Sequence, residues 1–271
     1  TEISSEFGLV ILDEMHHVSA KTFTETLNSM RSAVKLGLSG TTERKDGLHV
    51  VFEDYFGKDR FVGKRGNILT PEIHMYQVDN ELSGNQMIPW ADKVTALYKE
   101  PSYRKTIAAM CKLYAKQGHS VLVLSDRTEM LDYIEETCDD VAKITGDVKD
   151  DPKRGIYDRA SEIAKIESGQ AKILAGTQSI FSEGVSIPIL SCIILAVPTN
   201  NAPLLEQLIA RVQRLMDGKT KCVAVDIKLK GNTGFRHLNT RKGVYIKLGY
   251  PMIDYDLGKL IKETNKCLNQ T

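Results

Sequence analysis

Short, continuous apolar runs recur along this chain, and each of them ends in polar or charged residues. The first run covers residues 7–12 and stops at Asp13 and Glu14. Continuous apolar character, rather than alternation, is typical of a parallel strand buried on both faces. We therefore expect a central strand at residues 7–12, a helix from Ser19 to about Met30, and a second strand at residues 34–39.

From residue 72 onward, strand-like and helix-like segments alternate again. The expected strands cover residues 72–78, 120–125, 141–144, 172–176, 191–196 and 221–227, and the expected helices cover residues 104–117, 129–138, 157–168 and 203–216. This alternation predicts an α/β fold with parallel sheets and helices on both faces. Residues 57–72 are rich in Gly, Lys and Arg, so we expect them to connect two domains, residues 1–68 and residues 69–271.

The composition is that of a globular protein. The 271 residues are 42% hydrophobic and 26% charged, and their number suffices for about two domains. No apolar run approaches the roughly 18 residues of a membrane-spanning helix, and no secretory leader is evident, so we expect an intracellular protein without a membrane partner. The five cysteines are scattered and never form a CxxC pair, which favours free thiols.

Charge is distributed unevenly although the net charge is only +1. Residues 211–271 contain 13 Lys and Arg against 5 Asp and Glu, whereas residues 1–210 contain 23 against 30. A basic C-terminal region is compatible with contact to phosphate backbones, and equally with an ordinary solvated surface.

The adjacent carboxylates Asp13 and Glu14 carry the strongest chemical signal. ATP hydrolysis requires one carboxylate to hold Mg²⁺ through its waters and a second group to orient the attacking water. Any strand can end in such a pair, so the pair alone leaves a purely structural role open. A metal site at His16 and His17 is disfavoured because vicinal side chains point apart.

Four further segments place small hydroxyl residues after expected strands or arginines on an expected helix. Residues 39–41 follow the second strand, and residues 176–178 and 182–188 follow a later one, where hydroxyls and amides can bind phosphate. In the expected helix 203–216, the spacing predicts that Gln207, Arg211 and Arg214 share one face, away from the face of Leu204, Leu208 and Leu215. Plain loops and solvated arginines are the alternatives.

Taken in order, these segments resemble superfamily 2 helicases, particularly the DEAH-like DNA translocases. The matches are residues 13–16 to motif II, 39–41 to motif III, 42–47 to its charged extension, 121–127 to motif IV, 177–188 to motif V and 207–214 to motif VI. Ala210 replaces a glycine of the family, and Ser186 replaces an aspartate. The family's Gly-Lys-Thr phosphate loop is absent, since no strand leads directly into Gly218-Lys219-Thr220.

The resemblance implies RecA-like parallel sheets, with the C-terminal half of a first lobe at residues 1–68 and a complete second lobe at residues 69–271. It implies ATP and Mg²⁺ as cofactors. Asp13 would hold the magnesium through water, Glu14 would orient the attacking water or act as general base, and Gln207 would lie near that water. Arg211 and Arg214 would be arginine fingers that stabilise the transition state.

The remaining motif positions imply binding and coupling roles. Positions of the family that contact the nucleotide are occupied by Gly184 and Ser186. The residues that would contact the backbone of the nucleic acid are Ser125, Arg127 and Thr177. The resemblance favours DNA as that nucleic acid, and RNA is also possible. The residues that would couple the nucleotide state to closure of the lobes are His16, Ser39 and Thr41.

This chain is expected to be only part of a motor. The phosphate-loop segment is expected as a partner, either in the same polypeptide or as a separate chain, and without it this chain is expected to be inactive. A non-catalytic nucleic-acid-binding scaffold is the alternative function. A restriction-type nuclease would require a separate carboxylate cluster, and the sequence offers none.

Overall fold

The computed structural model describes residues 7–13, 15, 25, 27–39, 50–61, 63, 66, 68–146, 159–182 and 186–258. The chain divides into two compact units, Thr1–Gly66 and Asn67–Thr271. In the first unit, the described elements are β1 (Leu9–Leu12), β2 (Val34–Gly37) and α2 (Val50–Phe56). The two strands pair in parallel, with Leu9 opposite Val34 and Leu12 opposite Gly37.

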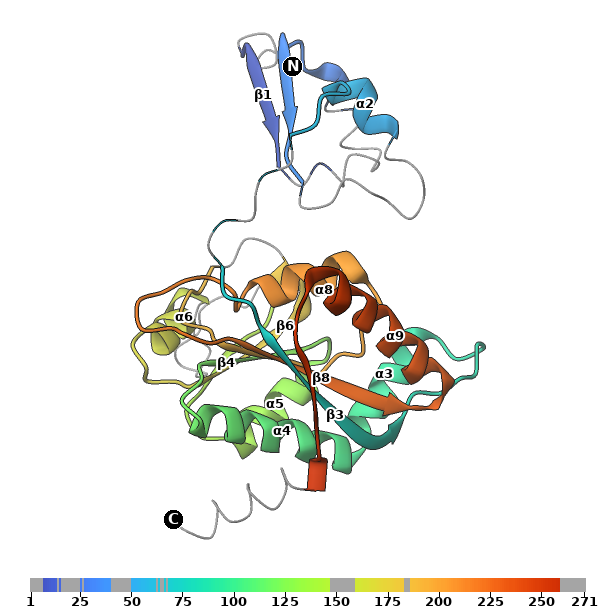
Figure 1. Cartoon of the computed structure of the whole chain (residues 1–271), viewed down its shortest axis with the longest axis vertical. Helices are drawn as coiled ribbons and strands as arrows, with labels where there is room; N and C mark the ends of the chain where they lie inside the picture. Colours follow the sequence, from blue (N-terminus) through green and yellow to red (C-terminus); the bar gives the residue numbers. More distant parts are fainter. Residues whose placement is uncertain are drawn as a thin grey trace. The chain divides into compact units, whose positions relative to one another are not determined.

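The second unit is built on one parallel sheet (Figure 1). Its strands are β3 (Glu72–Glu81), β4 (Val121–Ser125), β5 (Val141–Ile144), β6 (Ile173–Thr177), β7 (Cys192–Leu195), β8 (Val223–Lys230) and β9 (Met252–Tyr255). They lie in the order β5-β6-β4-β7-β8-β3-β9, and all of the pairings are parallel. The predicted α/β fold with parallel sheets is therefore confirmed.

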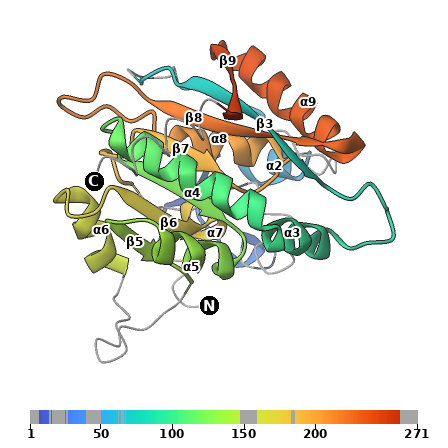
Figure 2. The same cartoon turned by 90° about the horizontal axis from the view of Figure 1, so that it is seen from below.

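Helices cover both faces of this sheet, as Figures 1 and 2 show. One face packs against α3 (Trp90–Lys99), α4 (Pro101–Lys116) and α5 (Thr128–Thr137). The other packs against α6 (Arg159–Glu167), α7 (Gln178–Ser182), α8 (Ala202–Ala210) and α9 (Gly231–Leu248). Burial on both faces explains why β4 and β7 are buried at every position, which is the pattern that predicted them.

Helices α3 and α9 and strand β9 were not predicted from the sequence. In α9, Gly234 and Gly243 weaken the intrinsic preference for helix, so packing of Leu238, Val244 and Tyr245 in the core must stabilise it. The first of these glycines is required by its surroundings, because a Cβ at Gly234 would lie 2.4 Å from the carbonyl oxygen of Leu229.

The expectation that the first strand is buried on both faces is wrong for β1. Leu9 and Ile11 are exposed, as are their partners Val34 and Leu36 in β2. The described hydrophobic side chains that pack in this unit gather around Leu27 instead. Most of the predicted helix from Ser19 to Met30 lies outside the described residues, although residues 27–29 are helical.

A buried ion pair joins α9 to the sheet. The Arg241 guanidinium donates to both carboxylate oxygens of Asp226 at 2.6–3.0 Å and to the carbonyl oxygens of Thr199 and Ile227 at 3.1 Å. Tyr245 donates to the same carboxylate at 2.7 Å. Both side chains are almost fully buried. Each one neutralises the charge of the other, and either charge alone would be unfavourable in the protein interior.

We predict that Arg241→Met lowers the free energy of unfolding by about 3–5 kcal/mol, because it leaves the Asp226 carboxylate buried without its cation. Urea unfolding of the chain measures this loss. The control, Lys247→Met, removes an exposed cation from the same helix and should change stability by less than about 0.5 kcal/mol. Equal effects of the two substitutions would contradict the role assigned to the pair.

Candidate functional site

The first unit brings Asp13 and Ser39 to the same edge of its sheet. Asp13 follows the carboxyl end of β1, and Ser39 lies two residues beyond the end of β2. Two backbone hydrogen bonds join these chain ends, from the Leu38 amide to the Leu12 carbonyl at 2.8 Å and from the Met15 amide to the Leu38 carbonyl at 2.9 Å. The carboxyl edge of a parallel sheet is where α/β proteins bind ligands.

Close packing beneath this edge requires the glycine at the end of β2. A Cβ at Gly37 would lie 2.3 Å from the sulfur of Met15 and 3.2 Å from the ring of Phe56. Met15 is therefore held against the sheet directly after the predicted acidic pair. Of the other predicted residues of this unit, Glu14, His16 and Thr41 lie outside the described residues, as does segment 42–47.

In the second unit, Ser125 and Thr177 are neighbours at the carboxyl edge. They end strands β4 and β6 and stand opposite each other in the parallel register. Ser125 is fully buried, and its hydroxyl both donates to the Arg127 carbonyl and accepts from the Arg127 amide at 3.0 Å. The hydroxyl thus closes the turn that leads to Arg127.

Arg127 is anchored on helix α3. Its Nε donates to the Thr95 hydroxyl and its Nη2 donates to the Ala91 carbonyl, both at 3.0 Å. A third bond, from Nη1 to the carbonyl of Asp126, measures 3.1 Å. Burial raises the pKa of the Asp126 carboxyl, and the positive charge of Arg127 partly opposes that rise. Because α3 was not predicted, sequence reasoning missed both residues that hold this arginine.

Thr177 differs from Ser125 in that its hydroxyl oxygen is buried without a hydrogen-bond partner among the described residues. Helix α7 begins at the next residue, and its Phe181 packs so closely on β6 that a Cβ at Gly176 would lie 2.3 Å from the ring. Ser186 is exposed in the segment that follows α7, while Gly184 lies outside the described residues.

The prediction that one helix presents Gln207, Arg211 and Arg214 on a single face is wrong. Helix α8 ends at Ala210, with Arg211 as its C-cap in helical conformation. Three successive i to i−3 hydrogen bonds follow, from the amides of residues 211, 212 and 213, so the chain tightens and then leaves the helix before Arg214. Leu215, expected to share the apolar helix face, is exposed for the same reason.

Gln213 accounts for the early end of this helix. Its backbone carbonyl accepts from the Leu69 amide at 2.9 Å, and its buried side-chain amide donates to the Leu69 carbonyl at 3.1 Å. Tyr250 donates to the side-chain oxygen at 3.2 Å. These bonds replace the hydrogen bonds that a continued helix would make. As a result, Gln207 lies on α8, whereas Arg211 and Arg214 lie on the turn that leaves it.

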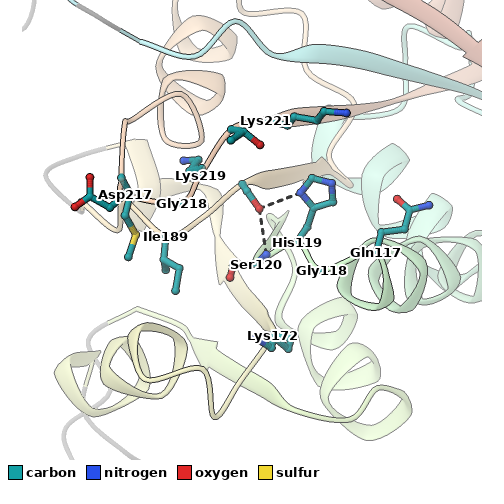
Figure 3. Close-up of a pocket in the computed structure, with 13 residues that line it drawn as sticks. Gln117, Gly118, His119, Ser120, Lys172, Ile189, Asp217, Gly218, Lys219 and Lys221 are labelled. Atoms are coloured by element: carbon teal, nitrogen blue, oxygen red, sulfur yellow. Dashed lines mark hydrogen bonds between the residues drawn. The ribbon is translucent and has the colours of Figure 1, made fainter.

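The rejected Gly218-Lys219-Thr220 string lies beside a cavity of about 500 Å³ at the opposite edge of the sheet (Figure 3). Its lining includes Ser120 and Ser191, which directly precede strands β4 and β7. The Lys219 ammonium donates to three carbonyl oxygens, those of Pro188, Leu190 and Arg214, at 2.6–2.9 Å. This lysine therefore joins the loop before β8 to the segment before β7, and its donors are directed at the protein.

Metal clusters, membrane-spanning helices and thiols are further features of the described part of the chain that bear on function. There, no three His, Cys, Asp or Glu side chains gather in a way that could hold a metal ion. None of the helices described combines the length and apolar character needed to cross a membrane. Four of the five cysteines, Cys111, Cys138, Cys192 and Cys222, are buried free thiols, and Cys267 lies outside the described residues.

Family models match two parts of the chain. The model for the helicase conserved C-terminal domain matches residues 105–216, and the model described as type III restriction enzyme, res subunit, matches residues 1–44. The first match contains strands β4–β7, helix α8 and the turn with the two arginines, and the second contains β1 and β2.

Similar proteins come from phages and yeast. The chain is 43% identical over 251 residues to probable helicase D10 of Escherichia phage T5, covering 93% of this chain and 55% of that protein. The crystal structure of T4 UvsW matches with a TM-score of 0.53 at 21% identity, over 94% of this chain and 55% of that one. Dbp5 of S. cerevisiae, solved with RNA and ADP BeF3, has a TM-score of 0.64 at 14% identity, over 97% and 62%.

The chain spans about half the length of the curated relatives that it matches. The ordered motifs, the parallel α/β sheets and these relatives agree with one another, and the family resemblance inferred from the motifs is confirmed. The chain contains a helicase conserved C-terminal domain at residues 105–216, and in its ordered motifs it is similar to the superfamily 2 helicases.

Proposed function

We propose that this chain supplies the hydrolysis and strand-binding residues of an ATP-dependent nucleic-acid helicase or translocase, most readily one that acts on DNA. The observation that carries the proposal is the position of Asp13 and Ser39 at the carboxyl edge of one sheet and of Ser125 and Thr177 at that of the other. Because the chain spans about half of its relatives, the activity is proposed for the protein together with a segment that contains a phosphate-binding loop.

Asp13 and Glu14 would act at the nucleotide. A carboxylate at a strand end, beside the hydroxyl residue Ser39, offers the oxygen ligands that Mg²⁺ prefers. Asp13 would hold the ion through water, and Glu14 would accept a proton from the attacking water or orient it. Magnesium, when bound, would neutralise charge on the phosphates. His16, Ser39 and Thr41 would transmit the nucleotide state to the rest of the protein.

Gln207, Arg211 and Arg214 would act on the same nucleotide from the second unit, together with Gly184 and Ser186. Guanidinium groups directed at the phosphates stabilise the charge that develops in the transition state. The early end of α8 supports this role, because a tight turn after Arg211 places the two arginines on a segment that Gln213 anchors to Leu69.

Arg127 and Thr177 would contact the nucleic-acid backbone, and Ser125 would position Arg127 rather than touch the strand. Burial of Ser125 and its two hydrogen bonds to Arg127 favour this division of roles. Contacts to phosphates would make binding largely independent of sequence and sensitive to salt. One structural neighbour, Dbp5, was solved with RNA, whereas T4 uvsW is described as a DNA helicase, so both polymers belong in the test.

The proposal predicts that single-stranded nucleic acid stimulates ATP hydrolysis by the complete protein. The association constant obtained from the stimulation should fall with salt, with a slope of log K against log salt of about −0.7 for each phosphate contact. Titrations with matched DNA and RNA oligonucleotides at several salt concentrations measure both quantities. Hydrolysis that neither polymer stimulates would contradict the proposal, and strand binding without any hydrolysis would favour a non-catalytic scaffold.

A further inference from the structure

An exposed tryptophan marks a second feature of the surface beside Arg127. Trp90 is the first residue of helix α3 and is 42% exposed. Its indole packs on the ring of His237 from helix α9, with ring centroids 5.1 Å apart and an interplanar angle of 38°. His237 is only 4% exposed, so a buried side chain supports the indole while much of the indole remains accessible.

The position of Trp90 follows from the bonds of Arg127. The Arg127 guanidinium donates to the carbonyl of Ala91, which directly follows Trp90, and to the hydroxyl of Thr95 one turn later. Arg127 itself follows the carboxyl end of β4. The first turn of α3 therefore adjoins the sheet edge where the backbone contacts of a nucleic-acid strand are proposed.

Cations lie near this aromatic pair. Burial lowers the pKa of His237, and the cations Arg241, Arg236 and Lys93 lower it further, while a backbone hydrogen bond with Pro198 raises it. Because Asp226 neutralises Arg241, the cations of this group that remain to attract a phosphate are Arg236 and Lys93. Asp92 is the acidic residue in the first turn of α3. Two further apolar side chains of the neighbouring segments are exposed, Met87 just before α3 and Phe235 in α9.

A supported, exposed ring among cations matches the chemistry of single-stranded nucleic acid. Bases present a π-face of any sequence to an aromatic side chain, and flanking cations attract the phosphates between bases. We propose that Trp90, supported by His237, is a stacking platform for a base of the strand whose backbone Arg127 and Thr177 contact. This inference rests on the proposed function, because the platform requires a bound nucleic-acid strand. It adds base stacking to the phosphate contacts proposed above.

Trp90 is the only tryptophan of the chain, so its fluorescence reports on the platform directly. Titration of the chain with a single-stranded oligothymidylate should quench the emission saturably. Trp90→Ala should weaken binding of a labelled oligothymidylate by about 5- to 100-fold, while Trp90→Phe should retain most of the affinity. Ile246→Ala, which removes an exposed apolar side chain elsewhere on α9, is the matched control and should bind as the parent does.

The outcomes separate this inference from the function on which it rests. If the chain binds the oligonucleotide but its emission is unchanged and Trp90→Ala retains full affinity, the platform is refuted and the proposed function stands. Equal quenching by inorganic polyphosphate would also overturn the platform, because phosphates alone would then account for the signal. If the complete protein also binds neither DNA nor RNA, both proposals fail. Circular dichroism of each variant confirms that the fold is retained.

Discussion

Replacement of Glu14 by Gln is expected to abolish ATP turnover by the complete protein while nucleotide binding persists. The amide keeps the size of the side chain and removes its ability to accept a proton or to orient the attacking water as a carboxylate does. We expect the rate of hydrolysis to fall by more than about 10³-fold, measured as phosphate release at saturating ATP and DNA. Binding of a fluorescent ATP analogue should be nearly unchanged.

The control for Glu14 is Glu53, a partly exposed carboxylate on the first unit. Glu53→Gln alters α2, where Glu53 pairs with Arg60 at 3.0 Å, and it should leave the rate of hydrolysis within about twofold, as expected for a surface ion pair. A Glu14→Gln protein that hydrolyses ATP at the parental rate would show that the acidic pair after β1 is structural.

The second large effect is expected for the arginines that follow α8. Arg211→Ala and Arg214→Ala should each lower the rate of hydrolysis by about 10³-fold or more, because the guanidinium that stabilises the transition state is lost. Arg211→Lys should recover little of the rate, since an ammonium lacks the planar, bidentate geometry of a guanidinium. Initial rates over a range of ATP concentrations distinguish this loss from weaker ATP binding.

Lys116→Ala provides the matched loss of one positive charge. Lys116 is exposed at the end of α4, which covers the other face of the sheet from α8. Its removal should not change the rate measurably. Parental rates for both arginine variants would contradict the proposed fingers and favour a scaffold that retains a helicase-like fold.

Much of the second unit could be predicted because its strands are buried on both faces. In β4, β6 and β7, nearly every side chain meets a helix layer, so the apolar runs are continuous and easily recognised. The polar residues that end these strands were identified from the same pattern, and Ser125 and Thr177 are indeed neighbours. Parallel register, rather than any local preference, brings them together.

Other features depend on contacts between distant residues and left no local signal. Helix α8 has a periodic sequence beyond Ala210, yet the bonds between Gln213 and Leu69, 144 positions apart, end it early. The anchoring of Arg127 depends on α3, a helix that the sequence pattern did not predict. The stack of Trp90 on His237 joins elements about 150 positions apart, and local periodicity cannot reveal such a pair.

The central claim is that Asp13 and the two arginines act on one nucleotide. The most direct test is a structure of the complete protein with magnesium, ADP–beryllium fluoride and single-stranded DNA. The account predicts Asp13 beside the magnesium and the guanidinium groups of Arg211 and Arg214 within about 3 Å of the fluoride ligands. A closed complex in which either set of side chains lies on a surface remote from the nucleotide would contradict the account.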